Sequence, residues 1–290
     1  MIPGGLVVVV IRGAVRLGCA LAVCGSVLVG CTSGGGEPSG SAPAKKAGAA
    51  ATADPSPTEV VDIDPARLPG TKARAAALIR DVLPDPSAFD PGAVRRTPYE
   101  SDPRRWPVLG DDCVWHQQAL PKDVLATLTR SYEIPASAAR GPLRLSAVVT
   151  VHRSAEQADW ENAEVLEEMM RCPSQQLRSD EVITSLNDVP NSLGDSGNEY
   201  ADDVLNELGT YTSAEVGGPH PYLWEQTRIG QFTLAVSAKG AKGWSQADLF
   251  DRLRDPHVGM RARLRAAIER DTPATASPSA SRSTGTTGAR

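Results

Sequence analysis

Cysteine is the residue type in this chain whose chemistry is indicated most clearly. Two of the five cysteines lie in an apolar run, 17–29, that has the length of a cleavable export signal, so both leave with it. Cys113 and Cys172 then form an even pair, which in an exported protein is most simply a disulfide. A metal site is the rival interpretation, but His116, in Cys113-Val114-Trp115-His116, is the one nearby imidazole, and no C-x-x-C spacing occurs. The sequence therefore predicts a Cys113–Cys172 disulfide and no metal ligands.

A serine between glycines is the best candidate nucleophile. The tetrapeptide Gly194-Asp195-Ser196-Gly197 resembles the one around the nucleophile of chymotrypsin-like proteases. That chemistry also needs a histidine base and a buried aspartate in a fixed geometry. No histidine here lies in an Ala-His-Cys context, and Asn198 stands where the protease family has glycine. We therefore favour a plain turn and keep an envelope hydrolase using Ser196 as the alternative.

Three further groups of residues could form a site. Residues 195–203 contain four acids, but their spacing is not that of a calcium-binding EF-hand loop, so we expect a solvated loop. Glu164, Glu167 and Glu168 could act as paired carboxylates, yet as the charged outer face of a helix they need no function. His220 lies between two prolines and could line a ligand pocket, although a rigid surface turn is the simpler interpretation.

The N-terminus predicts export and lipidation. Residues 1–30 contain no acid, and Arg12 and Arg16 precede an apolar run that is too short to span a bilayer. The run ends at Leu28-Val29-Gly30-Cys31, which resembles the lipobox of bacterial lipoprotein precursors. The resemblance implies cleavage before Cys31, a diacylglyceryl group such as one carrying palmitate on its thiol, and attachment to the extracytoplasmic face of the cell membrane. The alternative, an uncleaved anchor over 6–29, is disfavoured because the two arginines interrupt it.

Composition divides the mature chain into three parts. Residues 31–58 and 272–290 are rich in Gly, Ser, Ala, Pro and Thr, and such segments bury too little apolar surface to offset the entropy of ordering. We expect a disordered tether and a disordered tail around one extracytoplasmic domain, 59–271. Removing the two arginines of the signal leaves 28 basic against 35 acidic residues, a net charge of −7. This balance argues against nucleic acid as a partner.

Alternation and capping residues predict an α+β domain in which an antiparallel sheet is flanked by helices. The expected strands are 113–120, 124–134, 143–152, 182–186, 209–216, 222–229 and 232–238, with a hairpin turn at Gly230-Gln231. The expected helices are 71–83 capped by Thr71, a helix capped by Ser154 and ended by Pro173, and a closing helix from Ser245 to Ile268 with a break near Pro256. On the second helix we expect the buried stripe to be Trp160, Ala163, Leu166 and Met170.

Several short motifs resemble a known group of domains. They are Arg153-Ser154-Ala155-x-x-Ala158 after a strand, Trp160 in the helix that follows, Cys172, Leu193-Gly194-Asp195, and the strand 227–234. Over about residues 71–270 the chain thus resembles sensor-type extracellular domains of actinobacteria, which occur on receptor Ser/Thr kinases and as free lipoproteins. The resemblance implies a helix-flanked antiparallel sheet with a groove for an unidentified ligand, and it supplies no catalytic residue. Kinase-linked members carry more cysteines, so their full disulfide framework is not transferred.

The sequence therefore favours a non-enzymatic, membrane-anchored lipoprotein with a ligand-binding or sensor-like domain. The expected ligand is a small molecule, a cell-wall fragment or a protein. No Walker loop, dinucleotide fingerprint, G-x-S-x-G or H-E-x-x-H motif occurs, and we expect no cofactor.

Overall fold

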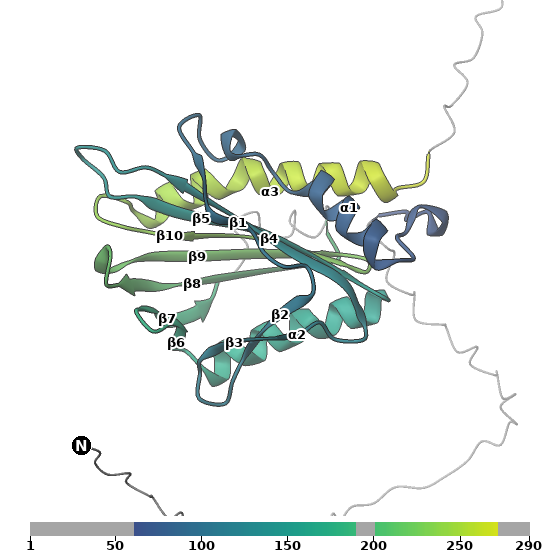
Figure 1. The fold of residues 1–290 in the computed structure, drawn as a ribbon, viewed down its shortest axis with the longest axis horizontal. Helices are drawn as coiled ribbons and strands as arrows, with labels where there is room; N and C mark the ends of the chain where they lie inside the picture. The colour runs from purple at the N-terminus through teal and green to yellow at the C-terminus, as the bar shows by residue number, and fades with distance from the viewer. Residues whose placement is uncertain (1–60, 190–200, 272–290) are drawn as a thin grey trace, which may run out of the picture. The chain divides into compact units, whose positions relative to one another are not determined.

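A computed structural model of the chain describes residues 61–189 and 201–271, which form one large antiparallel sheet between two outer layers (Figure 1). The strands in these ranges are β1 (Val94–Glu100), β2 (Arg105–Leu109), β3 (Trp115–Ala119), β4 (Val124–Ile134), β5 (Leu143–His152), β6 (Gln175–Arg178), β7 (Glu181–Asp188), β8 (Asp203–Ser213), β9 (Gly217–Ile229) and β10 (Phe232–Lys239). The helices are α1 (Lys72–Val82), α2 (Ala155–Arg171) and α3 (Gln246–Ile268), with short 3-10 turns at Pro65–Arg67 and Pro86–Ala88. The predicted α+β class is confirmed.

The main sheet has eight strands in the order β1-β4-β5-β10-β9-β8-β7-β6, and β2 and β3 form a separate hairpin. The centre of the sheet is regular: β5 pairs with β10 from Leu145 with Ala238 through Val151 with Phe232. The tight turn between β9 and β10 contains Gly230 at φ 54°, a conformation that glycine adopts without steric cost. The predicted hairpin at Gly230-Gln231 is therefore confirmed.

One face of the sheet packs against α1 and α3 and holds the main core. The alternation predicted for β5 is confirmed, because Leu143, Leu145, Ala147, Val149 and Val151 are all buried in this core. The helices start where the sequence indicated: the Thr71 hydroxyl accepts from the Arg74 N–H, and Ser245 forms a capping box with Asp248.

The opposite face of the sheet is covered by α2 and the β2–β3 hairpin, which lie together below the sheet in Figure 1. Ser154 caps α2 as predicted, since its hydroxyl accepts from the Gln157 N–H. The polar residues of β5, including Arg144, Ser146 and His152, point toward this second layer.

The orientation predicted for α2 is wrong. Trp160 is 69% exposed and Met170 is 74% exposed, whereas Glu168 is buried. The helix is rotated so that Cys172 at its end meets the hairpin, and residues four, seven, eleven and fourteen positions before Cys172 share its face. The inward stripe therefore contains two acids: Ala158, Glu161, Val165, Glu168 and Cys172.

Several predicted boundaries also differ from the structure. Helix α3 continues through Pro256 without a break, because buried side chains on both sides of the proline, such as Leu253 and Met260, hold it against the sheet. Strand β8 begins at Asp203 rather than at residue 209, and β9 begins at Gly217 rather than at residue 222. Strands β1 and β2 were not predicted, since each is largely exposed and contains a proline.

The two edges of the sheet are short or irregular. Strand β1 shifts register between Arg95 and Glu100 and contains Pro98, which has no N–H to donate. Strand β6, at the other edge, has four residues and a register shift between Gln176 and Arg178. Across residues 61–189 and 201–271, no helix combines the length and the hydrophobicity needed to cross a membrane.

Candidate ligand-binding cavity

A cavity of about 240 Å³ lies between the sheet and its second layer. We call it the central cavity. Its walls are mostly apolar and aromatic, which is typical of sites for small molecules. It is lined by Pro107, Trp115, Thr129, Ser146, Val148, Val165, Glu168, Gln175, Leu177, Ile183, Glu207, Tyr222 and Trp224.

Two smaller hollows adjoin the central cavity and share part of its lining. One, of about 90 Å³, extends along α2 and shares Trp115, Val165, Glu168 and Trp224 with it. The other, of about 230 Å³, extends over the sheet toward β6 and shares Ser146, Leu177, Tyr222 and Trp224 with it. The three together form a cleft that runs across the sheet beneath α2 and the hairpin.

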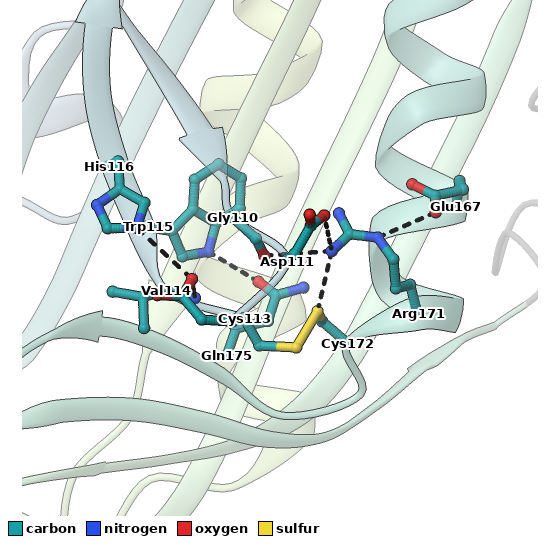
Figure 2. The surroundings of a disulfide bond; sticks show 11 residues. Gly110, Asp111, Cys113, Val114, Trp115, His116, Glu167, Arg171, Cys172 and Gln175 are labelled. Atoms are coloured by element: carbon teal, nitrogen blue, oxygen red, sulfur yellow. Dashed lines mark hydrogen bonds and ion pairs between the residues drawn. A yellow bond between two sulfur atoms is a disulfide. The ribbon is translucent and has the colours of Figure 1, made fainter. Parts of the chain in front are cut away.

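The outer wall of the cleft is held in place by the disulfide between Cys113 and Cys172, the pair predicted from the sequence (Figure 2). The two Cα atoms are 5.6 Å apart, a normal separation for a disulfide. Beside it the Trp115 indole N–H donates to the Gln175 side-chain oxygen at 2.9 Å, and Arg171 donates to the Gly110 carbonyl oxygen at 3.2 Å. The end of α2, the hairpin and the start of β6 thus form one cross-linked wall.

Two carboxyl groups face the central cavity from opposite sides. Glu168 comes from α2 and is 8% exposed, and Glu207 comes from β8 and is 7% exposed. Burial raises the pKa of Glu207 to about 7, and the negative charges of Glu168 and Asp188 add to the effect. Burial also raises the pKa of Glu168 to about 7, with Glu164 as the next cause and a hydrogen bond from the Leu109 N–H opposing it.

The carboxylate of Glu207 differs from the other acids of the cleft in its lack of polar partners. Among the described residues, no hydrogen-bond donor and no cation contacts its carboxylate. Nearby, the buried Trp224 indole N–H also has no hydrogen-bond partner in the described part of the chain. On this side of the sheet, Arg144 Nε and Gln157 Oε1 are also buried without a partner among the described residues, and of these three unpaired groups the Trp224 N–H is the one at the central cavity.

The carboxylate of Glu161, unlike that of Glu207, is paired within the fold. Glu161 on α2 lies 2.5 Å from His152 Nε2 and accepts from the Thr233 hydroxyl at 2.8 Å. At the next position of the helix, the Asn162 side-chain oxygen accepts from the Gln226 amide at 2.7 Å. These contacts attach the first half of α2 to β5, β9 and β10 and need no ligand to satisfy them.

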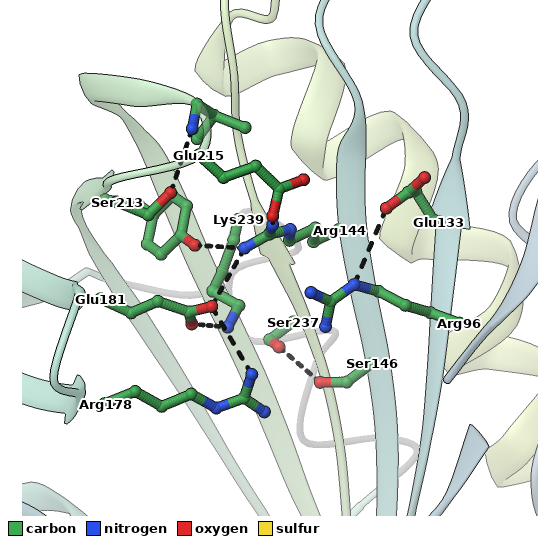
Figure 3. A network of polar contacts seen from close by, with 12 residues as sticks. Arg96, Glu133, Arg144, Ser146, Arg178, Glu181, Ser213, Glu215, Ser237 and Lys239 are labelled. Atoms are coloured by element: carbon green, nitrogen blue, oxygen red, sulfur yellow. Dashed lines mark hydrogen bonds and ion pairs between the residues drawn. The ribbon is translucent and has the colours of Figure 1, made fainter. Parts of the chain in front are cut away.

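The end of the cleft toward β6 carries a network of ion pairs centred on Glu181 (Figure 3). Arg144 donates to Glu181 at 3.0 Å and to the Tyr211 hydroxyl at 2.8 Å, and Lys239 donates to Glu181 at 2.8 Å. Burial alone would raise the pKa of Glu181, but the bond from Lys239 and the neighbouring positive charges outweigh it and lower that pKa. Most of the charges here are paired within the fold, which gives the network a structural role.

The other residues considered from the sequence lie away from the cavity or outside the described residues. His220 Nε2 is 3.0 Å from the Val216 carbonyl oxygen near the β8–β9 turn, and His116 is exposed, 3.6 Å from Asp112. Glu167 is exposed and pairs with Arg171, whereas the outer-face interpretation is wrong for Glu168. Cys31 and Ser196 lie outside the described residues. The predicted tether, 31–58, and the predicted tail, 272–290, also lie outside them. In residues 61–189 and 201–271, no group of three or more His, Cys, Asp or Glu side chains could hold a metal ion.

Sequence reasoning named Glu168 but assigned it to the outer face of its helix, and it missed the other residues that line the cavity. Glu207 falls between a predicted loop and a predicted strand, and Trp224 was placed in a strand without a face being assigned. A usable signal existed for α2: counting back four and seven residues from the bonded Cys172 selects Glu168 and Val165, both of which line the cavity. The pairing of Glu168 with Glu207 depends on long-range contacts and has no local signal.

Comparison with known proteins gives a distant structural likeness and no match in sequence. No protein-family model matches the sequence, and no curated protein matches it. The extracellular domain of PknH from Mycobacterium tuberculosis is similar in structure, with a TM-score of 0.43 and 10% sequence identity, covering 69% of this chain and 99% of that chain.

Proposed function

We propose that this chain is a non-enzymatic lipoprotein of the cell envelope whose extracytoplasmic domain binds a small, largely apolar molecule in the central cavity. The observation that carries the proposal is the cavity itself: an apolar and aromatic space of about 240 Å³ whose unpaired polar groups lie at its wall. Export and lipid attachment rest on the sequence, through the signal segment and Cys31.

The wall of the cavity explains why a bound molecule would be favoured. A void among packed side chains leaves its lining without van der Waals partners, and an apolar ligand restores those contacts. The Trp224 N–H and the carboxyl groups supply the few polar contacts that fix a ligand's orientation. The disulfide holds the outer wall in place before binding, so less ordering entropy is lost when a ligand binds.

The test uses the full mature chain with Cys31→Ser, because acyl chains and detergent would compete for an apolar cavity. The protein is mixed with a small-molecule extract of the cell envelope, and bound molecules are identified by native mass spectrometry and by thermal shift. A ligand at a hundred times its Kd stabilises the folded state by about 2.7 kcal/mol. Failure of both measurements to detect any bound small molecule would overturn the proposal.

A matched pair of variants assigns binding to the cavity. Val165→Trp fills the cavity from α2, whereas Leu166→Trp adds the same group on the exposed side of the same helix. We expect Val165→Trp to abolish the ligand-induced shift and Leu166→Trp to retain it. Equal binding by both variants would place the ligand elsewhere and contradict the assignment.

A further inference from the structure

Glu207 is the side chain in the central cavity whose burial the fold does not explain. A carboxyl group that is 7% exposed loses most of its hydration, and in folded proteins such groups are normally paired with a cation or with several N–H donors. The charged groups that act on Glu207 are Glu168 across the cavity and Asp188 on β7, and both are negative. A positively charged partner beside this carboxyl group would therefore stabilise the folded protein.

Glu168 faces the same space and is only partly compensated. The groups acting on it are Glu164, Glu167 and Arg171 on its own helix and the Leu109 N–H from β2. Arg171 is directed away from the cavity, because it pairs with Glu167 and with the Gly110 carbonyl oxygen (Figure 2). One N–H bond is therefore the main contact that the described residues offer to this carboxylate.

The aromatic side chains around the two carboxyl groups suit the same kind of partner. Trp115, Tyr222 and Trp224 line the cavity beside Glu168 and Glu207. The face of an aromatic ring attracts a cation, most strongly when the cation is desolvated, as it would be here. Apolar side chains such as Val148, Val165 and Ile183 complete the wall and suit a hydrocarbon group.

We propose that the central cavity binds an organic amine, with its ammonium group between Glu168 and Glu207 and its apolar part against the aromatic and aliphatic wall. This inference rests on the proposed function and adds the chemical class of the ligand. A free metal cation fits less well, because most of the lining is apolar and offers few oxygen ligands. An anionic ligand is disfavoured in this part of the cleft, since the Arg144 and Lys239 cations lie in the neighbouring hollow and are paired with Glu181.

The test compares three probes of similar shape and different charge: benzylamine, benzyl alcohol and phenylacetate. Binding is measured by calorimetry on the full mature chain with Cys31→Ser at about pH 8, where both carboxyl groups are ionised. A buried charged hydrogen bond contributes about 1.5–3 kcal/mol, so benzylamine should bind at least about tenfold more tightly than benzyl alcohol. Benzylamine stays protonated down to about pH 5, where both carboxyl groups are neutral and this preference should disappear.

Isosteric variants separate recognition from folding. Glu207→Gln and Glu168→Gln should each remove most of the preference for benzylamine over benzyl alcohol. Glu156→Gln, at an exposed position in the first turn of α2, is the matched control and should keep the preference. Measurable binding of benzyl alcohol, together with a cooperative thermal transition, reports that each variant is folded and that its cavity is intact.

The possible failures have different meanings. Equal binding of benzylamine and benzyl alcohol, or tighter binding of phenylacetate, would overturn the amine inference and leave the proposed function standing. Binding of a molecule from the envelope extract without binding of any of the three probes would also overturn the amine inference and leave the proposed function standing. A chain that binds neither the probes nor any extract component would overturn both.

Discussion

Replacing Glu207 with glutamine should change how the stability of the protein depends on pH. Folding raises the pKa of this carboxyl group from its ordinary 4.5 to about 7, chiefly through burial. Between these two values the folded protein holds a proton that the unfolded chain has lost, so the free energy of unfolding falls as the pH rises. The penalty is small below about pH 4.5 and complete above about pH 7. Glutamine has nearly the same shape as the protonated acid and does not ionise.

The size of the effect follows from the pKa difference. At 1.36 kcal/mol for each pKa unit, a rise from 4.5 to about 7 corresponds to about 3 kcal/mol. Glu207→Gln should therefore match the wild type near pH 4.5 and be about 3 kcal/mol more stable near pH 8. For a domain of roughly 200 residues, that difference raises Tm by about 6–12 °C. Glu168 titrates in the same window and repels Glu207, so the effects of the two single variants will not add in the double variant.

Urea denaturation of the ligand-free protein at a series of pH values measures the effect directly. Glu156→Gln serves as the control, because its exposed side chain should give a curve parallel to that of the wild type. The result that refutes the reasoning is a constant difference between Glu207→Gln and the wild type from about pH 4.5 to about pH 8. That outcome would mean that solvent or an unseen donor already compensates this carboxylate in the folded state.

Three further predictions concern the rest of the chain. Loss of the Cys113–Cys172 bond, whose cysteines are 59 residues apart, should lower the free energy of unfolding by about 2–5 kcal/mol. Denaturation with and without reductant measures this loss. Two free alkylatable thiols in the exported protein would contradict the bond itself. Cys31→Ser should release the protein from the membrane, and a variant that still incorporated a fatty-acid probe would disprove lipidation at this position. A 59–271 fragment should melt cooperatively with the Tm of the mature chain, and a non-cooperative transition would show that 31–58 or 272–290 contributes to folding.

Local signals in the sequence predicted the main elements well where one physical effect dominates. The period-two alternation of β5 and the caps at Thr71, Ser154 and Ser245 were confirmed because each depends on neighbouring residues. The continuity of α3 through Pro256 was not predicted, since tertiary packing there outweighs the lost backbone hydrogen bond.

The candidate site was harder to predict for a different reason. A hydrophobic pattern predicts that a helix buries its apolar stripe, and α2 instead exposes Trp160 and Met170 and buries Glu168. The predicted disulfide was the sequence signal for this orientation, since the bonded Cys172 shares a helix face with Glu168. Departures of this kind from local expectation are typical of functional sites.

The edges of the large sheet limit how this domain can associate with other proteins. Many domains recruit an extended peptide by adding it as an extra strand, which requires an exposed edge with a regular row of backbone donors and acceptors. Here β1 interrupts that row with Pro98 and a register shift, and β6 offers only four residues. Both edges therefore act against unwanted strand pairing between copies of the domain. A protein partner would have to recognise side chains on the helices or the hairpin rather than extend the sheet.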